Sequence, residues 1–264
     1  AGWFIAGGDS LAPPALPRQR TWVDGFVVRE FPVTNGEYIE FLHDLVDNGR
    51  VAEAEALAPH ERGGRAEELG ALVYAFDGSR FSLTEDSDGD LYLEDWPVIM
   101  VDWRAARAYA AWEAARTGLP WRLGASLEWE KAARGTDGRL FPWGNHHDPT
   151  WSHMHRSHKG RPNPVEIGTY PADVSVYGVR DMAGNARDWC LDEYDQAGHP
   201  QAVIADIPDP DLGAFDTQRV VRGGAWLDAA NNCRCAFRGG VAQYYRGANF
   251  SFRLFRSLVD ADVG

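Results

Sequence analysis

The sequence predicts an α+β fold with short strands, few helices and much irregular structure. Only three segments of the 264 residues have a helical pattern of apolar residues. The remainder consists of brief β-prone runs separated by turns, which agrees with 28 glycines and 15 prolines. No internal repeat and no low-complexity linker divides the chain, so we expect a single domain over residues 1–264.

The first elements expected are two strands. β-prone residues occupy positions 3–5 and 22–28, and the segment between them is rich in glycine and proline. This arrangement is typical of two strands in one hairpin-like unit.

A helix follows these strands. Thr34 and Glu37 have the three-residue spacing of a capping box, in which each side chain bonds the backbone N–H of the other residue. Apolar residues then recur at intervals of three and four, as they do on one face of an amphipathic helix: Tyr38, Phe41, Leu42 and Leu45.

Two further helices are expected near the middle of the chain. Asp102 is a suitable N-cap for the first, and Gly118 stands where this helix would end. The second is the short segment "SLEWEKAARG", which ends at Gly135. From residue 136 onward the chain has turns and short β-like runs.

Composition restricts the partners. The net charge is −13, and the pI is near 5.0. A nucleic acid or an anionic membrane surface would be repelled, so we expect neither, and we expect a protein or a small-molecule ligand. No apolar run approaches the roughly 20 residues of a membrane span. The three cysteines form a poor disulfide framework, which favours the cytoplasm, or export by a signal outside this sequence.

Eight ordered blocks carry a resemblance that covers almost the entire chain. They read "FIAGGD", "FPVTNGEY", "WPVIMVDW", "RLGASLEWEKAARG", "FPWGN", "YGVRDMAGNARDWC", "RVVRGGAWLDAANNCRCAFR" and "NFSFRLFR". The chain resembles the formylglycine-generating-enzyme (sulfatase-modifying factor) family, which implies a C-type-lectin-like fold. It departs from the family pattern before Trp129, where "GAS" replaces a usual Pro-Thr-Glu. The resemblance does not imply one activity, because this frame hosts oxidases, sulfoxide synthases, kinase-linked modules and non-catalytic binders.

The resemblance also raises a question about sulfur chemistry. In the oxidases of the family, two cysteines five residues apart hold copper(I), and these positions correspond to Asp228 and Cys233 here. Copper(I) prefers soft sulfur ligands, and a carboxylate is a hard oxygen donor. We therefore expect no copper and no oxidase activity, and Cys233 is catalytic only if the chain is an enzyme after all. A metal clip formed by Cys233 and Cys235 stays open beside the simpler interpretation of small buried hydrophobes.

A calcium site is implied by the resemblance. The family calcium loop falls on "DMAGNARDW", where the ligands would be two carboxylates and two backbone carbonyls: Asp181, Gly184, Ala186 and Asp188. The alternative is a glycine-bearing turn whose acids cap nearby amides. A second family calcium site, near His153 and Met154, lacks the expected acids. The segment "DSDGD" at 86–90 fails the spacing of an EF-hand loop and predicts an acidic turn.

Histidines gather in "HHDPTWSHMHRSH", residues 146–158. A metal site needs convergent ligands, which this spacing does not show, so a pH-sensitive surface loop is the preferred interpretation and metal binding is the alternative.

The segment of about 222–256 has the composition of a recognition surface, in which aromatic residues offer contact area and Asn, Gln and Gly adapt to the partner. It resembles the variable segment of diversity-generating-retroelement proteins. We therefore expect a non-catalytic ligand- or protein-binding domain of bacterial type. The alternatives are an oxygen-dependent sulfur-oxidising enzyme and a sensor module of a bacterial signalling kinase. The residues expected to bind are Trp226, Asp228, Asn231, Phe237, Gln243, Tyr244, Tyr245 and Asn249.

Overall fold

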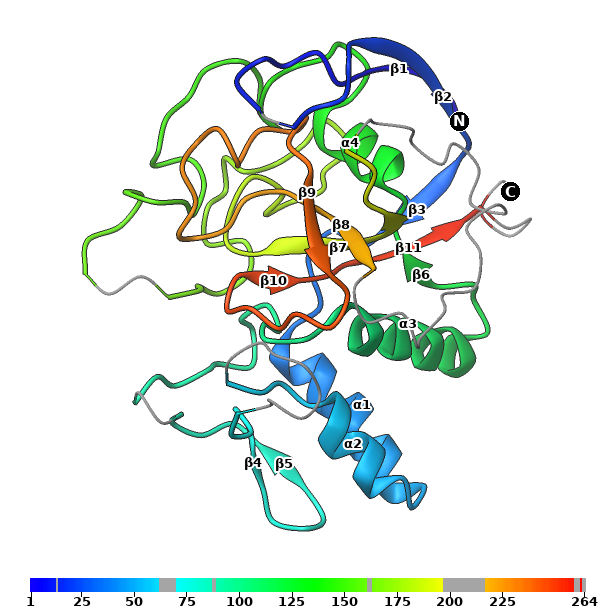
Figure 1. Cartoon of the computed structure of the whole chain (residues 1–264), viewed down its shortest axis with the longest axis vertical. Coiled ribbons are helices and arrows are strands. Elements are labelled where there is room, and N and C mark those ends of the chain that lie inside the picture. Colours follow the sequence, from blue (N-terminus) through cyan, green and yellow to red (C-terminus); the bar gives the residue numbers. More distant parts are fainter. Residues whose placement is uncertain are drawn as a thin grey trace.

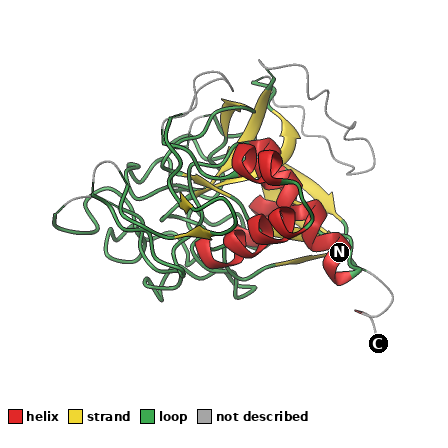
Figure 2. Cartoon of the chain, turned by 90° about the horizontal axis from the view of Figure 1, so that it is seen from below, coloured by secondary structure: helices red, strands yellow, loops and turns green. Residues whose placement is uncertain are grey.

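A computed structural model of the chain confirms the predicted α+β class, with four helices, short strands and long loops in the described residues (Figures 1 and 2). The structure describes residues 1–12, 14–61, 70–86, 89–160, 163–196, 217–258 and 262. No helix among these residues is long and apolar enough to cross a membrane. The elements are β1 (Gly2–Ala6), β2 (Gln19–Val23), β3 (Phe26–Val28), α1 (Asn35–Asp47), α2 (Val51–Leu57), β4 (Ala75–Phe76), β5 (Phe81–Ser82), α3 (Trp103–Thr117), β6 (Arg122–Leu123), α4 (Ser126–Arg134), β7 (Arg187–Glu193), β8 (Gln218–Arg222), β9 (Gly239–Ala242), β10 (Phe250–Ser251) and β11 (Leu254–Ser257).

The expected pair of N-terminal strands is present as β1 and β2, which are antiparallel and place Trp3 opposite Trp22. The prediction of one continuous strand over 22–28 is wrong. β2 ends at Val23, and β3 pairs with β11 in a different sheet, of order β3-β11-β6. The chain changes sheet at Gly25, where a Cβ would lie 2.3 Å from Leu258 Cδ1, so a side chain there would clash with the neighbouring segment.

Helix α1 begins with the predicted capping box. The backbone N–H of Glu37 donates to Thr34 Oγ1 at 3.3 Å, and that of Thr34 donates to Glu37 Oε2 at 3.1 Å. The apolar face is buried as expected. It packs in the largest core cluster, where Tyr38 and Phe41 meet Tyr109 of α3.

Helices α3 and α4 also occupy the predicted segments. Asp102 caps α3 by accepting from the N–H of Ala105 at 2.8 Å, and Gly118 ends it in the left-handed region with φ of 68°. Helix α4 is buried along its entire length. Its Glu130 forms ion pairs with Arg134 (2.6 Å) and with Arg222 of β8 (2.8 Å), so the helix is anchored to the central sheet by a buried charge network.

The central sheet positions the C-terminal half of the chain. Its order is β10-β7-β8-β9, in which β7 is parallel to β10 and antiparallel to β8. The loop 223–238 connects β8 to β9, and the loop 243–249 connects β9 to β10. Loop 223–238 leaves the sheet at Arg222, opposite Asp188 near the start of β7, and loop 243–249 returns to the sheet at Phe250, beside Arg187 of β7 (Figure 1).

Candidate functional site

The site expected from the sequence lies where loops 223–238 and 243–249 meet the first residues of β7. Asp188 of β7 stands opposite Arg222, the last residue of β8, and β8 continues into the turn at Gly223. Gly223 has φ of 74°, and a Cβ on it would lie 2.9 Å from the carbonyl of Met182. This close approach requires glycine and fixes the direction in which the loop leaves the sheet.

Asp228 is buried in a two-point ion pair with Arg187. The Nε and Nη2 atoms of Arg187 donate to the two carboxylate oxygens at 2.8 and 2.5 Å. Asp228 also accepts from the N–H of Ala225 at 2.8 Å and from Asn232 Nδ2 at 3.2 Å. The guanidinium lies 4.8 Å from the centre of the Phe237 ring. Each oxygen of Asp228 thus has two donors, and the carboxylate holds the loop together.

Cys233 offers little reactivity. Its side chain is 1% exposed and packs with Phe141, Met154 and Ala183. Burial, together with the negative charge of Asp228, raises the pKa of the Cys233 thiol well above its usual range, so the thiol stays protonated.

The other two cysteines are buried and free as well. Burial raises the pKa of Cys190 and of Cys235. Cys235 packs in a different apolar cluster from Cys233, with Trp129 and Val220. This separation argues against a metal clip and agrees with the interpretation of buried hydrophobes.

The eight residues expected to bind divide into two groups. The first group is accessible to solvent: Tyr245 (40%) and Asn231 are exposed, and Trp226, Tyr244 and Asn249 are half-buried. The structure buries Asp228, Phe237 and Gln243, so the prediction that these three side chains contact a ligand does not agree with their positions. Phe237 lies beneath Arg187, and Gln243 accepts from Arg219 Nε at 3.2 Å, so both support the loops from within.

Sequence reasoning missed two residues of this site. Leu227 is 44% exposed and stands between Trp226 and Asp228, but a single apolar residue gives no pattern. Arg187 supplies the charge that Asp228 needs. The sequence gives little signal for Arg187, because Asp188 beside it is a more obvious carboxylate partner for a buried cation than Asp228.

Three of the predicted calcium ligands, Asp181, Gly184 and Ala186, lie in the loop before β7, and Asp188 is the second residue of β7 itself. Asp181 has positive φ (53°), is 5% exposed and accepts from the N–H of Gly168 at 2.8 Å. Oδ2 of Asp188 accepts from Trp129 Nε1 at 2.7 Å and from Arg253 Nε at 2.6 Å. Oδ1 of Asp188 is buried without a hydrogen-bond partner. An unsatisfied carboxylate oxygen of this kind fits a hard cation.

The histidine loop does not converge on one point. His146, His147 and His155 are exposed. His153 is buried, with Nε2 2.8 Å from the carbonyl of Asn163, and burial lowers its pKa. Among the described residues, no group of three or more His, Cys, Asp or Glu side chains is placed to hold a metal ion.

The segment 86–90 lies only partly in the described chain. The N–H of Gly89 donates to the carbonyl of Asp86 at 3.0 Å, as in a turn, while positions 87 and 88 fall outside the described residues.

The chain has an α+β fold with short strands, and buried ion pairs hold its long C-terminal loops against a sheet. These features are those of a C-type-lectin-like domain with formylglycine-generating-enzyme topology. The sequence profile of the sulfatase-modifying factor enzyme 1-like domain matches residues 1–258. The chain belongs to this family.

Its curated relatives differ in what they are named for. The hercynine oxygenase of Mycolicibacterium smegmatis is 31% identical over 90% of this chain and 55% of its own length. The mouse formylglycine-generating enzyme is 27% identical, over 96% and 72% of the two chains. The serine/threonine-protein kinase Pkn1 of Chlamydia trachomatis is 28% identical, over 90% and 34%. The chain thus spans about a third of the kinase and about half of the oxygenase.

Solved structures agree on the fold. PvdO from Pseudomonas aeruginosa superposes with a TM-score of 0.69 at 21% identity, covering 98% of this chain and 92% of that one. Variable protein 1 of Treponema denticola superposes with a TM-score of 0.64 at 18% identity, covering 98% and 93%. The frame is therefore shared by proteins named for catalysis, for signalling and for sequence variability.

Proposed function

We propose that this chain is a non-catalytic binding domain that contacts a protein or small-molecule ligand through loops 223–238 and 243–249. One observation carries the proposal: the carboxylate of Asp228, at the position where oxidases of the family have a copper-binding thiol, is fully engaged by Arg187, Ala225 and Asn232. Each carboxylate oxygen of Asp228 already accepts two hydrogen bonds, so neither oxygen is free to bind a metal cation.

The second position of the thiol pair supports the same proposal. A nucleophilic or metal-binding cysteine acts as a thiolate, which requires a lowered pKa and access to the substrate. Cys233 has the opposite properties, since it is buried and its pKa is raised. Redox chemistry at Cys233 would require the ion pair of Arg187 and Asp228 to break and the packing of Cys233 against Phe141 to be lost.

The contact surface consists of side chains that the loops leave exposed. We define the recognition surface as Trp226, Leu227, Asn231, Tyr244, Tyr245 and Asn249. Tyr and Trp provide large contact area with few rotatable bonds, and Asn adapts its hydrogen bonds, as in other paratopes. The buried network beneath, from Arg187 to Asp228, lets these side chains change without loss of the frame.

We propose further that the segment 222–256 is a variable region of the kind found in diversity-generating-retroelement proteins. Two observations support this: the exposed side chains concentrate in two loops of that segment, and the chain shares its fold with Treponema denticola variable protein 1. A reverse-transcriptase gene beside the gene for this chain, with a near-copy of its 3′ segment, is the expected finding. A neighbourhood without either removes the support for variability.

We also propose a structural calcium ion at Asp181, Gly184, Ala186 and Asp188. It would give Oδ1 of Asp188 the partner that it lacks and would fix the loop from which β7 starts. The ion would steady the frame and would take no part in recognition.

Two measurements test the binding function. Metal analysis followed by oxygen uptake with thiol peptides should give neither stoichiometric copper or iron nor turnover, and turnover would favour the enzyme alternative. A partner captured by the wild type should be lost by Leu227→Asp and Tyr245→Ala, and retained by Leu91→Asp. Leu91 is 49% exposed, close to the 44% of Leu227, and lies outside the recognition surface. Equal retention by all variants would contradict the proposed surface.

A further inference from the structure

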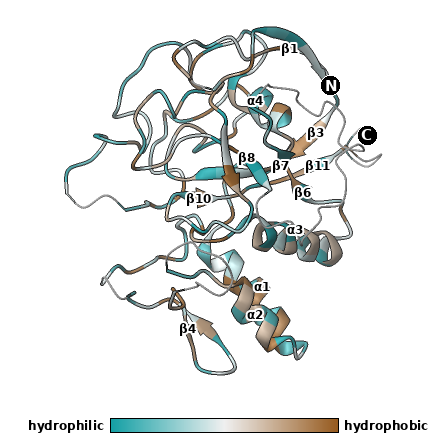
Figure 3. Cartoon of the chain, in the orientation of Figure 1, coloured by the Kyte–Doolittle hydropathy of each residue, from teal (hydrophilic) through white to brown (hydrophobic). Residues whose placement is uncertain are grey.

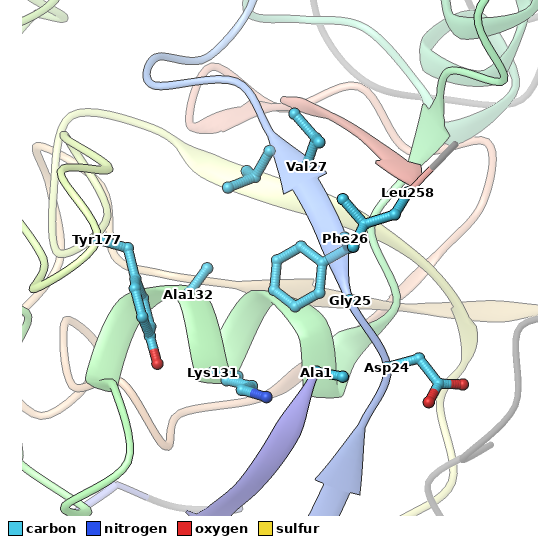
Figure 4. Close-up of a pocket in the computed structure, with 10 residues that line it drawn as sticks. Ala1, Asp24, Gly25, Phe26, Val27, Lys131, Ala132, Tyr177 and Leu258 are labelled. Atoms are coloured by element: carbon cyan, nitrogen blue, oxygen red, sulfur yellow. The ribbon is translucent and has the colours of Figure 1, made fainter. Parts of the chain in front are cut away.

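A groove lies along β3, and none of the residues that line it belongs to the recognition surface. Its volume is about 430 Å³. β3 forms one wall, and α4 forms the other through Lys131 and Ala132 (Figure 4). The rings of Phe26 and Tyr177 stand on either side of Ala132 in this view. β3 is also one of the hydrophobic segments in Figure 3.

β3 is an edge strand, and one side of its backbone faces this groove. Arg29 donates to the carbonyl of Leu254 at 3.0 Å, and Leu258 donates to that of Gly25 at 3.5 Å, so odd-numbered residues of this strand bond to β11. In an antiparallel pair, hydrogen-bonding direction alternates along the strand. The N–H and C=O groups of Phe26 and Val28 therefore point away from β11.

Just after β3, the same side of the backbone does form a hydrogen bond with another segment of the chain. The next residue in the alternation, Glu30, accepts from the N–H of Arg180 at 2.9 Å. Beside Phe26 and Val28, no described residue supplies such a partner. The groove therefore lies beside the part of β3 whose outward backbone groups have no partner in the described chain. The N–H and C=O groups of Phe26 and Val28 face it at the spacing of a β-strand.

Lys131 places a buried positive charge in the same groove. Its side chain is 7% exposed, and its Nζ donates to the carbonyls of Gly2 (2.8 Å) and Val23 (3.3 Å). An ammonium group has three donors, so one remains. None of the ion pairs within the described residues involves Lys131. Burial lowers the pKa of Lys131, and the charge of Asp24, which also lines the groove, opposes this shift without forming an ion pair.

We propose that this groove binds the C-terminal end of an extended peptide. The peptide adds to β3 as a further strand, and its backbone pairs with Phe26 and Val28. Its terminal carboxylate accepts a hydrogen bond from the remaining N–H of Lys131. An apolar side chain near the end packs on Ala132 between the two rings. Free backbone groups at strand spacing complement another extended backbone, and the unpaired ammonium complements a carboxylate.

The test uses dye-labelled tetrapeptides of randomised sequence, in one set with a free C-terminal carboxylate and in a second set with a C-terminal amide. Binding to the full chain is followed by fluorescence polarisation. We expect selected free-acid peptides to bind at least tenfold more tightly than their amides. Equal affinity of the two forms, or no binding by any free-acid peptide, would overturn the proposal.

Variants of the chain separate the two parts of the site. Lys131→Met should weaken the selected peptides at least tenfold, while Lys159→Met should leave affinity unchanged. These are the two lysines of the sequence, and Lys159 is exposed. If Lys131→Met does not fold, Val28→Pro decides, because proline removes only the outward N–H and edge strands tolerate it. Unchanged affinity in Val28→Pro would contradict strand addition.

A final arm distinguishes a peptide from a small carboxylate. Methylation of alternate peptide nitrogens removes backbone donors and keeps the carboxylate, so it should abolish binding. If the methylated peptide and octanoate bind as well as the parent peptide, the groove is a small-molecule carboxylate site and strand addition is excluded.

Discussion

The guanidinium of Arg187 donates two hydrogen bonds to the carboxylate of Asp228, although the two residues are 41 positions apart in the chain. One comes from the start of β7 and the other from the loop after β8, so the pair closes the loop onto the sheet. Both side chains are nearly buried, at 11% and 6% exposure. The resemblance to the oxidases of the family implies a thiol at this position, and in this chain Asp228 instead holds the loop against the sheet.

Replacement of one member of this pair should be costly. Asp228→Ala leaves the guanidinium of Arg187 buried without its partner, and the free energy of unfolding should fall by about 3–5 kcal/mol. The double variant Arg187→Met with Asp228→Leu removes both charges and should recover most of that loss. Urea unfolding of the wild type, Asp228→Ala and the double variant measures both effects. A loss of less than about 1 kcal/mol in Asp228→Ala would show that the pair does not hold the loop.

Stability should distinguish the exposed aromatic residues of loops 223–238 and 243–249 from the buried one. Phe237→Ala removes a ring that lies under Arg187 and should lower the free energy of unfolding by about 3–5 kcal/mol. Tyr245→Ala removes a side chain that is 40% exposed, so it should cost about 1 kcal/mol or less. Thermal and urea unfolding give the comparison. Similar losses in both variants would place Tyr245 in the core and remove it from the recognition surface.

The proposed calcium ion should stabilise the fold in proportion to its occupancy. At a calcium concentration one hundred times the dissociation constant, the expected gain is about 2.7 kcal/mol. Melting in EGTA, in calcium and in magnesium measures it, and magnesium is the control because it requires a regular octahedral site. Asp181→Asn should reduce the calcium shift. A melting temperature that calcium does not change would exclude the ion, and Asp188 Oδ1 would then be an unsatisfied buried oxygen.

The parts of the fold that the sequence predicted are those governed by local chemistry. The capping box of Thr34 and Glu37 begins α1, and Gly118 ends α3. Both act within a few residues, so the sequence alone predicts these helix ends. The limits of the site depend on distant partners. Asp228 was predicted to bind a ligand, and only the fold shows that Arg187, 41 positions away, engages its carboxylate. The dipeptide Asp24-Gly25 is a local turn signal, but only the fold shows that the chain changes sheet there and packs against Leu258.

The buried carboxyl of Asp192 should give the stability of the chain a measurable pH dependence. Burial raises its pKa to about 6. The folded state therefore binds this proton more tightly than the unfolded chain does, and the resulting stability is complete below about pH 4 and is lost as the pH rises through about 6. Urea unfolding between pH 4 and pH 7 should show a falling component that Asp192→Asn lacks. Glu193→Gln alters the exposed neighbour and should keep that component. If Asp192→Asn retains the wild-type slope, the Asp192 carboxylate is ionised throughout the range, and its charge must be balanced inside the protein.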